Sequence, residues 1–238
     1  CDYLVISDGV FSKFKNLVSN NKVKPKYDNS LAIRGVISKD NIPKINIRNI
    51  SLFLGSNFHY VVYPLNFNGD LNFIGIIKHK VLLNKEIHHS LSDIFSNDEF
   101  LKGILKKMPP FFNQFYDNLN EVKVFPIFVS NDFYKPNNNN IHFIGDAFFA
   151  FPPSFAQGAS QSIESAYELF KSIENNIESN FFKNRVKKTK MINIRSKFNQ
   201  FTFHLSNPIS VFFRNIFLKR LVKNKKFLES YLGKIYRN

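Results

Sequence analysis

Apolar and polar residues alternate along four segments in the first third of the chain. These segments cover residues 31–38, 45–54, 59–64 and 71–79. Alternation of this kind is typical of strands that bury one face. Asn68, Gly69 and Asp70 stand between the last two segments, and these residue types accept the positive φ angles of a hairpin turn. The pattern therefore predicts an antiparallel sheet.

A helical spacing of apolar residues replaces the alternation further along the chain. It predicts helices over 90–96 and 97–108, and Pro109-Pro110 ends the second of them. The chain is therefore expected to mix helices and strands. The remaining predicted elements are a helix over 111–119, a strand over 122–129 and, from residue 180 onward, two or three basic helices broken near Asn207-Pro208 and Asn224.

Residues 141–170 read as a strand, an acidic turn, a proline loop and a helix in immediate succession. The strand ends in Gly145-Asp146, and an ionised Asp146 offers only hydrogen-bond acceptors, which suit a ligand rich in hydroxyl groups. The loop over 156–159 opens the helix, so free N–H groups and the positive dipole end can face an electron-rich ligand edge. We interpret the segment as a ligand site rather than as an ordinary turn in which Asp146 only caps. The apolar residues that predict the helix are Ile163, Ala166, Tyr167 and Phe170.

A second acidic turn follows the apolar strand at the start of the chain. This strand leads into Asp8-Gly9, and then come a hydroxyl and basic residues, of which Lys15 is the last. A strand followed by Asp-Gly is by itself a common turn. Because Cys1 falls inside the strand, we expect the chain to be the C-terminal portion of a longer protein.

Both acidic turns resemble motifs of FAD-dependent monooxygenases related to p-hydroxybenzoate and salicylate hydroxylases. In that family a Gly-Asp motif usually reads G-D-A-A-H, followed by a proline loop, G-Q-G-A-N-Q and an acidic pair, and an Asp-Gly motif lies well over one hundred residues earlier. The resemblance implies that Asp146 binds the ribityl chain, that the helix start faces the flavin N1–C2=O edge and that Asp8-Gly9 lies near the pyrophosphate. The implied cofactor-binding residues are Asp8, Gly9, Gly145, Asp146, Pro153, Gln157, Gly158, Ala159 and Ser160.

This chain departs from the family pattern within both motifs. Lys15 stands where the Asp-Gly motif usually ends in Arg, which keeps the charge and loses the bidentate geometry. In the Gly-Asp segment, Phe149 replaces His, Ala156 replaces Gly, Ser160 replaces Asn and Ser165 replaces Asp. The flavin loop is otherwise retained, and no acid or base catalyst is assigned.

The resemblance implies an α/β fold, mixed with α+β parts, and a discontinuous domain arrangement. Residues 1–27 and 138–177 would form the C-terminal part of a doubly wound FAD-binding domain. Residues 28–137 would form an antiparallel-sheet substrate-binding domain, and residues 178–238 basic C-terminal helices. The family begins with a βαβ unit whose G-x-G-x-x-G turn holds the dinucleotide phosphates. This sequence contains no such turn, so we expect an incomplete FAD-binding domain.

The activity that the resemblance implies is that of an FAD-dependent monooxygenase. Such an enzyme uses NAD(P)H and dioxygen to hydroxylate an aromatic or similarly electron-rich small molecule through a flavin C4a-hydroperoxide. Arg34 and Tyr63 resemble recurring strand positions of salicylate-hydroxylase-like enzymes and are the candidate substrate-pocket residues. The alternative for Arg34 is a structural ion pair, and the alternative for Tyr63 is a core aromatic. The expected partners are the small-molecule substrate, dioxygen and the missing N-terminal portion of the same protein, without which the chain is expected to be inactive.

Two other functions stay open. A flavoprotein oxidoreductase of the same fold, of the ubiquinone-pathway hydroxylase or prenyl reductase type, would share the cofactor. Ubiquinone-type relatives tend to read H-P-x-A-G-Q-G-x-N-L-G after the Gly-Asp motif, and residues 150–162 do not. The second alternative is a non-catalytic remnant that binds a partner or a membrane.

The charge distribution bears on the partners. The formal charge of the 238 residues is +15. Residues 178–238 carry fifteen Lys and Arg against Glu178 and Glu229, a balance of +13, so the cofactor motifs lie in a nearly neutral part. We therefore expect no nucleic-acid partner and only a minor membrane contact, through phenylalanines of the basic tail.

Residue usage narrows the cellular context. A single cysteine excludes an internal disulfide framework. No signal peptide is visible and no apolar run is long enough to span a membrane, so a cytoplasmic location is expected. No metal site is expected, because His88 and His89 have no acidic partner at metal-ligand spacing.

Overall fold

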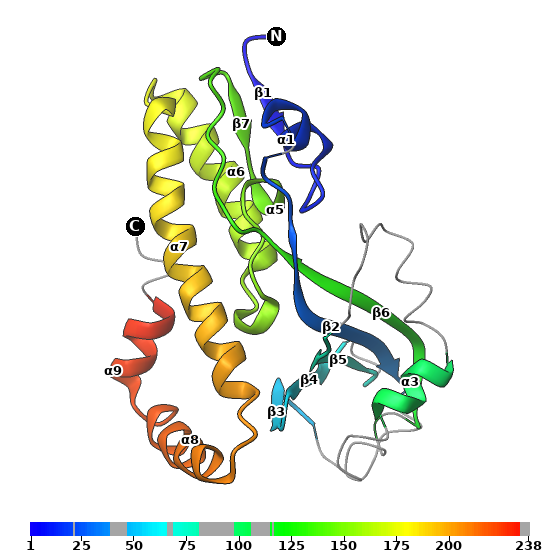
Figure 1. The fold of residues 1–238 in the computed structure, drawn as a ribbon. Helices are drawn as coiled ribbons and strands as arrows, with labels where there is room; N and C mark the ends of the chain where they lie inside the picture. The colour runs from blue at the N-terminus through cyan, green and yellow to red at the C-terminus, as the bar shows by residue number, and fades with distance from the viewer. Residues whose placement is uncertain are drawn as a thin grey trace. The chain divides into compact units, whose positions relative to one another are not determined.

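The structure is a computed structural model that describes residues 1–20, 22–38, 47–65, 69–80, 98–105, 115 and 117–233 (Figure 1). It confirms the mixed α/β fold class, with an antiparallel sheet, a parallel pair of strands and a set of helices. The predicted helix over 90–96 and most of the one over 111–119 lie outside the described residues, as do Asn68, His88 and His89.

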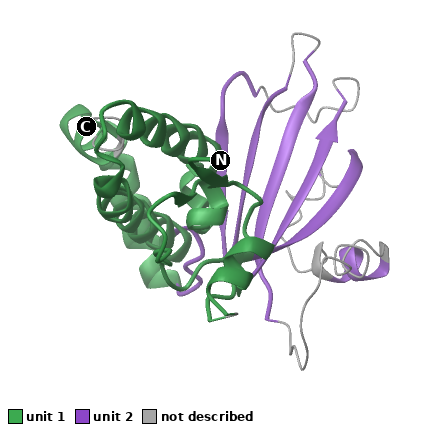
Figure 2. Cartoon of the chain, turned by 90° about the horizontal axis from the view of Figure 1, so that it is seen from above, with its two compact units in different colours: residues 1–28, 128–202, 208–238 green, residues 29–127, 203–207 purple. Residues whose placement is uncertain are grey.

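The chain divides into two compact units (Figure 2). Unit 1 contains Cys1–Asp28, Phe128–Thr202 and Pro208–Asn238, and unit 2 contains Asn29–Ile127 and Phe203–Asn207. At both ends of Asn29–Ile127 the chain passes from one unit to the other inside a strand. The two strands are β2 (Lys26–Ile37) and β6 (Leu119–Val129). The assignment of FAD binding and substrate binding to separate domains stays a prediction.

Unit 2 is built on a five-stranded sheet with the order β3-β4-β5-β2-β6. Its other strands are β3 (Ser51–Gly55), β4 (Phe58–Pro64) and β5 (Leu71–Lys78), and β3-β4, β4-β5 and β2-β5 pair antiparallel. The strands predicted from the alternating pattern are therefore present. The strand predicted over 45–54 begins only at Ser51.

One face of this sheet forms the core of unit 2. Leu31, Ile33, Val62 and Phe73 are fully buried, and the register places all four on the same face. The ring of Phe115 packs against that of Tyr60 on this face, with ring centroids 5.6 Å apart. Unit 2 also contains the short helix α3 (Asp98–Leu105).

Unit 1 contains the parallel pair of β1 (Leu4–Ile6) and β7 (Ile141–Phe143) (Figure 1). After β1 comes α1 (Lys13–Val18). After β7 come α5 (Gly145–Phe148), the 3-10 turn η2 (Pro153–Phe155) and α6 (Gly158–Glu174). Ile6 and Phe143, at the two strand ends, pack with Phe148 in the core of this unit.

The C-terminal part of the chain is helical, as predicted. It comprises α7 (Glu178–Phe203), α8 (Pro208–Leu221), α9 (Lys225–Leu228) and the π-helical turn η3 (Glu229–Gly233). Breaks occur at the predicted places near Asn207-Pro208 and Asn224. None of the helices within the described residues combines the length and the apolar character needed to cross a membrane.

Helix α6 is oriented opposite to a usual amphipathic helix. Its apolar stripe is open to solvent, with Ile163 74%, Tyr167 60% and Phe170 58% exposed. Its buried side is mostly polar and includes Gln161 and Ser165. An apolar stripe of this kind marks a surface that another element can cover.

Candidate functional site

The two acidic turns lie at the same edge of the parallel pair. Ile6 pairs with Phe143, and each motif begins two residues beyond that pair, Asp8-Gly9 after β1 and Gly145-Asp146 after β7. The Ile144 N–H donates to the Ile6 carbonyl at 3.0 Å and extends the pairing by one step. Carboxyl ends of adjacent parallel strands are where ligands bind in sheets of this kind.

Gly145 holds the turn against the start of α6. Its φ angle is +58°, and a Cβ there would stand 2.9 Å from the Ser162 hydroxyl oxygen, so only glycine fits. The Gly145 N–H donates to the Ser165 hydroxyl at 3.0 Å, and that hydroxyl donates to the Ser162 carbonyl at 2.8 Å. Ser165, which replaces the Asp of the family motif, therefore keeps the turn attached to the helix without a charge.

Asp146 stands in the first turn of α5 and is exposed. Neighbouring protein shields the Asp146 carboxyl partly from water, which raises its pKa above the ordinary value. The nearby Lys15 ammonium opposes this shift. Asp8 is also exposed, and its carboxylate accepts a hydrogen bond at 3.0 Å from the N–H of Lys13, the first residue of α1, whose N-cap is Ser12. Both carboxylates therefore remain available at the surface.

Lys15 supports both motifs from inside the protein. The residue is 4% exposed, and its ammonium donates to the Phe148 carbonyl at 3.3 Å. Burial lowers the pKa of Lys15 to about 8, although Asp8 and Asp146 both attract the cation. The basic residue at the end of the Asp-Gly motif thus links the two turns electrostatically.

The proline loop leads into an open helix start. Pro153 begins η2, and Gln157, which is buried, precedes α6. Gly158, Ala159 and Ser160 are exposed. Gln157 is the N-cap residue of α6, and among the described residues its side chain makes no capping hydrogen bond. A Cβ on Gly158 would meet nothing within 4 Å. The start of α6 is therefore exposed and has no side-chain cap from Gln157.

Ala156 adopts a backbone conformation that suits the glycine of the family motif. Its φ angle is 52°, in the left-handed region. This conformation costs a non-glycine residue about 1–2 kcal/mol, and glycine loses about 0.4–1 kcal/mol of this gain through the entropy of the unfolded chain. Ala156→Gly should therefore raise the free energy of unfolding by about 0.5–1 kcal/mol.

Urea denaturation followed by circular dichroism measures the effect of Ala156→Gly. The matched control is Ala159→Gly, since Ala159 lies in helical conformation inside α6 and should lose about 0.5–1 kcal/mol. Equal shifts in the same direction for both variants would contradict the strain at Ala156.

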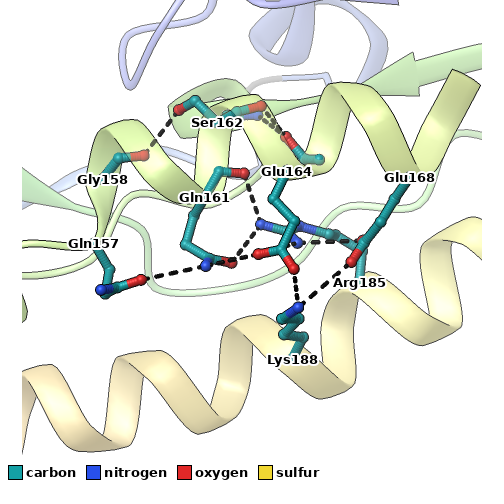
Figure 3. A network of polar contacts seen from close by, with 10 residues as sticks. Gln157, Gly158, Gln161, Ser162, Glu164, Glu168, Arg185 and Lys188 are labelled. Atoms are coloured by element: carbon teal, nitrogen blue, oxygen red, sulfur yellow. Dashed lines mark hydrogen bonds and ion pairs between the residues drawn. The ribbon is translucent and has the colours of Figure 1, made fainter. Parts of the chain in front are cut away.

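Behind the open helix start, Gln161 organises a polar network between α6 and α7 (Figure 3). It is buried, and its amide Nε2 donates to Glu164 Oε2 at 2.8 Å and to Gln157 Oε1 at 3.4 Å. The carbonyl and the Oε1 of Gln161 both accept from Arg185 Nη2, at 2.8 and 2.7 Å. Gln157, at the loop, is thereby connected to α7.

Arg185 is the centre of this network and is 2% exposed. Its Nη1 contacts Glu168 at 3.2 Å and Glu164 at 3.8 Å. Lys188 pairs with Glu164 and, at 3.7 Å, with Glu168 (Figure 3). Sequence reasoning did not single these residues out, although the second glutamine and the acidic pair of the family motif fall on Gln161, Glu164 and Ser165. Arg185 carried no comparable signal.

The phenylalanines after the Gly-Asp turn belong to the core. Phe149, which replaces the family's His, is 3% exposed and stacks on Phe133 with ring centroids 4.4 Å apart. Phe148 packs against Phe182 at 5.8 Å. A small hollow nearby is lined by Phe148 and Phe149 together with Gly145, Asp146, Gly158 and Arg185. Phe149 therefore contributes packing where a histidine would contribute a titratable group.

Arg34 and Tyr63 lie in unit 2. Arg34 pairs with Ile74 and Tyr63 with Asn72, so the register places both on the sheet face opposite the apolar core. Arg34 is exposed, and its guanidinium lies over the Phe125 ring at 5.8 Å from the centroid. The two predicted pocket residues share a face, and their contact with a substrate stays a prediction.

Within the part of the chain that the structure describes, no three His, Cys, Asp or Glu side chains come together as a metal site. His59 of β4 pairs with His204, which follows α7. His59, buried, lies 2.7 Å from His204 between ring nitrogens.

Comparison with known proteins finds likeness at the level of structure. No protein-family model and no curated protein matches the chain. Klebsiella pneumoniae HpxO, solved with FAD and uric acid, superposes with a TM-score of 0.75 at 13% identity over 99% of this chain and 60% of that one. A salicylate hydroxylase substrate complex gives 0.72 at 14% identity over 93% and 60%.

The 2,6-dihydroxypyridine-3-hydroxylase of Arthrobacter nicotinovorans gives a TM-score of 0.70 at 16% identity, over 87% of this chain and 59% of that one. These similarities confirm the expected fold, which is that of the FAD-dependent hydroxylases. The chain spans about 60% of the length of these solved structures.

Proposed function

We propose that this chain is part of an FAD-dependent monooxygenase that uses NAD(P)H and dioxygen to hydroxylate an aromatic or similarly electron-rich small molecule. One observation carries the proposal. The Asp8-Gly9 and Gly145-Asp146 turns share one edge of a parallel strand pair, and the second turn is followed at once by an open helix start. The similar fold of HpxO, which was solved with FAD, supports the proposal.

The donors and acceptors at this edge fit an FAD cofactor. Asp146 supplies a carboxylate that accepts hydrogen bonds from ribityl hydroxyls. The N–H groups of Gly158, Ala159 and Ser160 supply donors at a positive helix end, with open space in front of Gly158. Bound there, the flavin would supply the redox and oxygen-transfer chemistry.

The other site residues hold this arrangement in place. Asp8 accepts from the first N–H of α1, and Gly9, at a φ angle of +82°, lets the chain turn beside the proposed cofactor position. Pro153 and the buried Gln157 fix the loop that presents the helix start. The role of this chain is thus to bind and orient the flavin, and the substrate face of unit 2 with Arg34 and Tyr63 is proposed to select the substrate.

Such an enzyme also needs the βαβ unit that grips the dinucleotide phosphates. Surfaces that could receive it are present on unit 1. Leu4 and Val5 of β1 are 36% and 45% exposed, and α6 presents its apolar stripe of Ile163, Tyr167 and Phe170 to solvent. We therefore propose that a βαβ unit with a G-x-G-x-x-G turn, encoded upstream of this chain, completes the cofactor site.

Asp146→Ala tests the cofactor assignment in the extended protein, in which this chain is joined to that upstream unit. Loss of a charge-assisted hydrogen bond to a ribityl hydroxyl, worth about 1.5–3 kcal/mol, should weaken FAD binding by roughly tenfold to a hundredfold. Titration of the apo form with FAD, followed by flavin fluorescence, measures the affinity.

The control is Asp2→Ala, which removes an exposed carboxylate at the other end of the β1 segment and should leave the affinity unchanged. The 238-residue chain alone should release FAD during gel filtration. Equal FAD affinity in the parent and in Asp146→Ala would refute the ribityl contact. Failure of the folded extended protein to bind FAD at all would refute the proposed function.

A further inference from the structure

Helix α8 presents phenylalanines to solvent. Phe212, Phe213 and Phe217 are 61%, 53% and 61% exposed, and Ile209 is 68% exposed. Phe212, Phe213 and Phe217 follow Ile209 by three, four and eight residues, which places all four along one side of the helix. This side of α8 is therefore an exposed apolar face.

The opposite side of α8 is occupied by a cation. Arg214 is 9% exposed, and its guanidinium contacts the Thr202 carbonyl at 3.4 Å and the Asn215 side-chain oxygen at 3.1 Å. A usual surface helix buries its apolar side and exposes its charges. In α8 the three phenylalanines are exposed instead, while Arg214 is buried, so the exposed apolar face is suited to an environment other than water.

Basic residues cluster at the C-terminal end of this face. Lys219 and Arg220 occupy the last turn of α8, and Lys223, Lys225 and Lys226 follow directly. Between residues 208 and 228 the chain contains no acidic residue. The apolar face thus ends in a strongly positive segment.

We propose that α8 lies in the surface of an anionic lipid bilayer. Its exposed phenylalanines would enter the boundary between acyl chains and headgroups, while the neighbouring lysines and arginines contact lipid phosphates and carboxylates. A second copy of the chain is a poorer occupant, because pairing would bring two basic segments together. The proposal is independent of the flavin site, since α8 carries none of its residues.

Vesicle sedimentation of the 238-residue chain tests this proposal. The chain should bind vesicles of phosphatidylcholine with phosphatidylserine at least about tenfold more tightly than vesicles of phosphatidylcholine alone. The triple variant Phe212→Ser, Phe213→Ser and Phe217→Ser should lose about tenfold or more of the affinity for anionic vesicles. Its remaining binding should disappear at high salt, because only charge then holds it.

The matched control is the triple variant Ile163→Ser, Tyr167→Ser and Phe170→Ser, which removes three exposed apolar side chains from α6. It should bind anionic vesicles as the parent does, and circular dichroism should show both variants folded. The proposal is overturned if the parent binds no vesicles, or if the α8 variant binds as tightly as the parent. A parent dimer that the α8 variant lacks, without vesicle binding, would assign the face to self-association instead.

Discussion

Replacing Arg185 by Met should lower the free energy of unfolding of this chain by about 3–5 kcal/mol. Arg185 is almost completely buried and donates to Gln161 and to Glu168. Met fills a similar volume but removes the donor of the buried Gln161 side-chain oxygen and leaves the Glu168 carboxylate with Lys188 alone among the described residues, at 3.7 Å. The polar groups left without the guanidinium, rather than the lost attraction, account for most of the expected cost.

Urea denaturation of Arg185→Met and of Lys188→Met separates this effect from a general loss of charge. Lys188 contacts the same two glutamates from the rim of the network, with 13% of its side chain exposed. Its replacement should cost about 1 kcal/mol or less. A similar loss in both variants would show that Arg185 has no special position in the network.

Gly158→Val should lower the FAD affinity of the extended protein on the order of 100-fold while leaving the fold intact. A Cβ at Gly158 meets nothing within 4 Å in this chain, so the new side chain begins in open space. It would instead occupy the space in front of the first N–H groups of α6, where the flavin edge is proposed to lie. Reduction of the bound flavin by NAD(P)H should slow as well.

The chain offers a closely matched control in Gly103→Val. Gly103 also lies in a helix, α3, and a Cβ there likewise meets nothing within 4 Å. This variant should keep the FAD affinity and the reduction rate of the parent, measured by flavin fluorescence and stopped-flow absorbance. If Gly158→Val matches it in both, the loop is a structural turn only.

Sequence patterns predicted many of the strands and helices, because these elements depend mainly on residues that are close together in the chain. Alternation marked β4 and β5, and the Gly-Asp segment marked the order of strand, turn and helix. The direction in which α6 faces could not be predicted in this way. Periodicity shows that Ile163, Tyr167 and Phe170 share a side, but burying Gln161 and Ser165 instead depends on partners from α7 and from the Gly145 turn.

The strand, turn and helix of the candidate cofactor segment were predictable from its sequence motif, whereas the residues that support this segment were not. Arg185 lies in a long basic helix, and its sequence predicts that all the charged side chains are exposed to solvent. Arg185 differs from the other cations of α7 only because it packs against α6. The positive φ of Ala156 likewise follows from the geometry of the proline loop. Sequence gave no sign that Lys15 would be buried beneath both turns, because a short polar helix usually exposes its lysines.

The parallel pairing of β1 with β7 has a consequence for the order of folding. The whole antiparallel sheet lies between the two strands in the chain, so direct pairing would have to close a very long loop. β2 and β6 are neighbours in that sheet, and the rings of Tyr27 and Phe128 stand 5.8 Å apart at their ends. A sheet that folds first therefore leaves only residues 7–25 and 130–140 to bring β1 and β7 together. The edge with both acidic turns would then form last, so a chain whose synthesis stops before β7 could not assemble it.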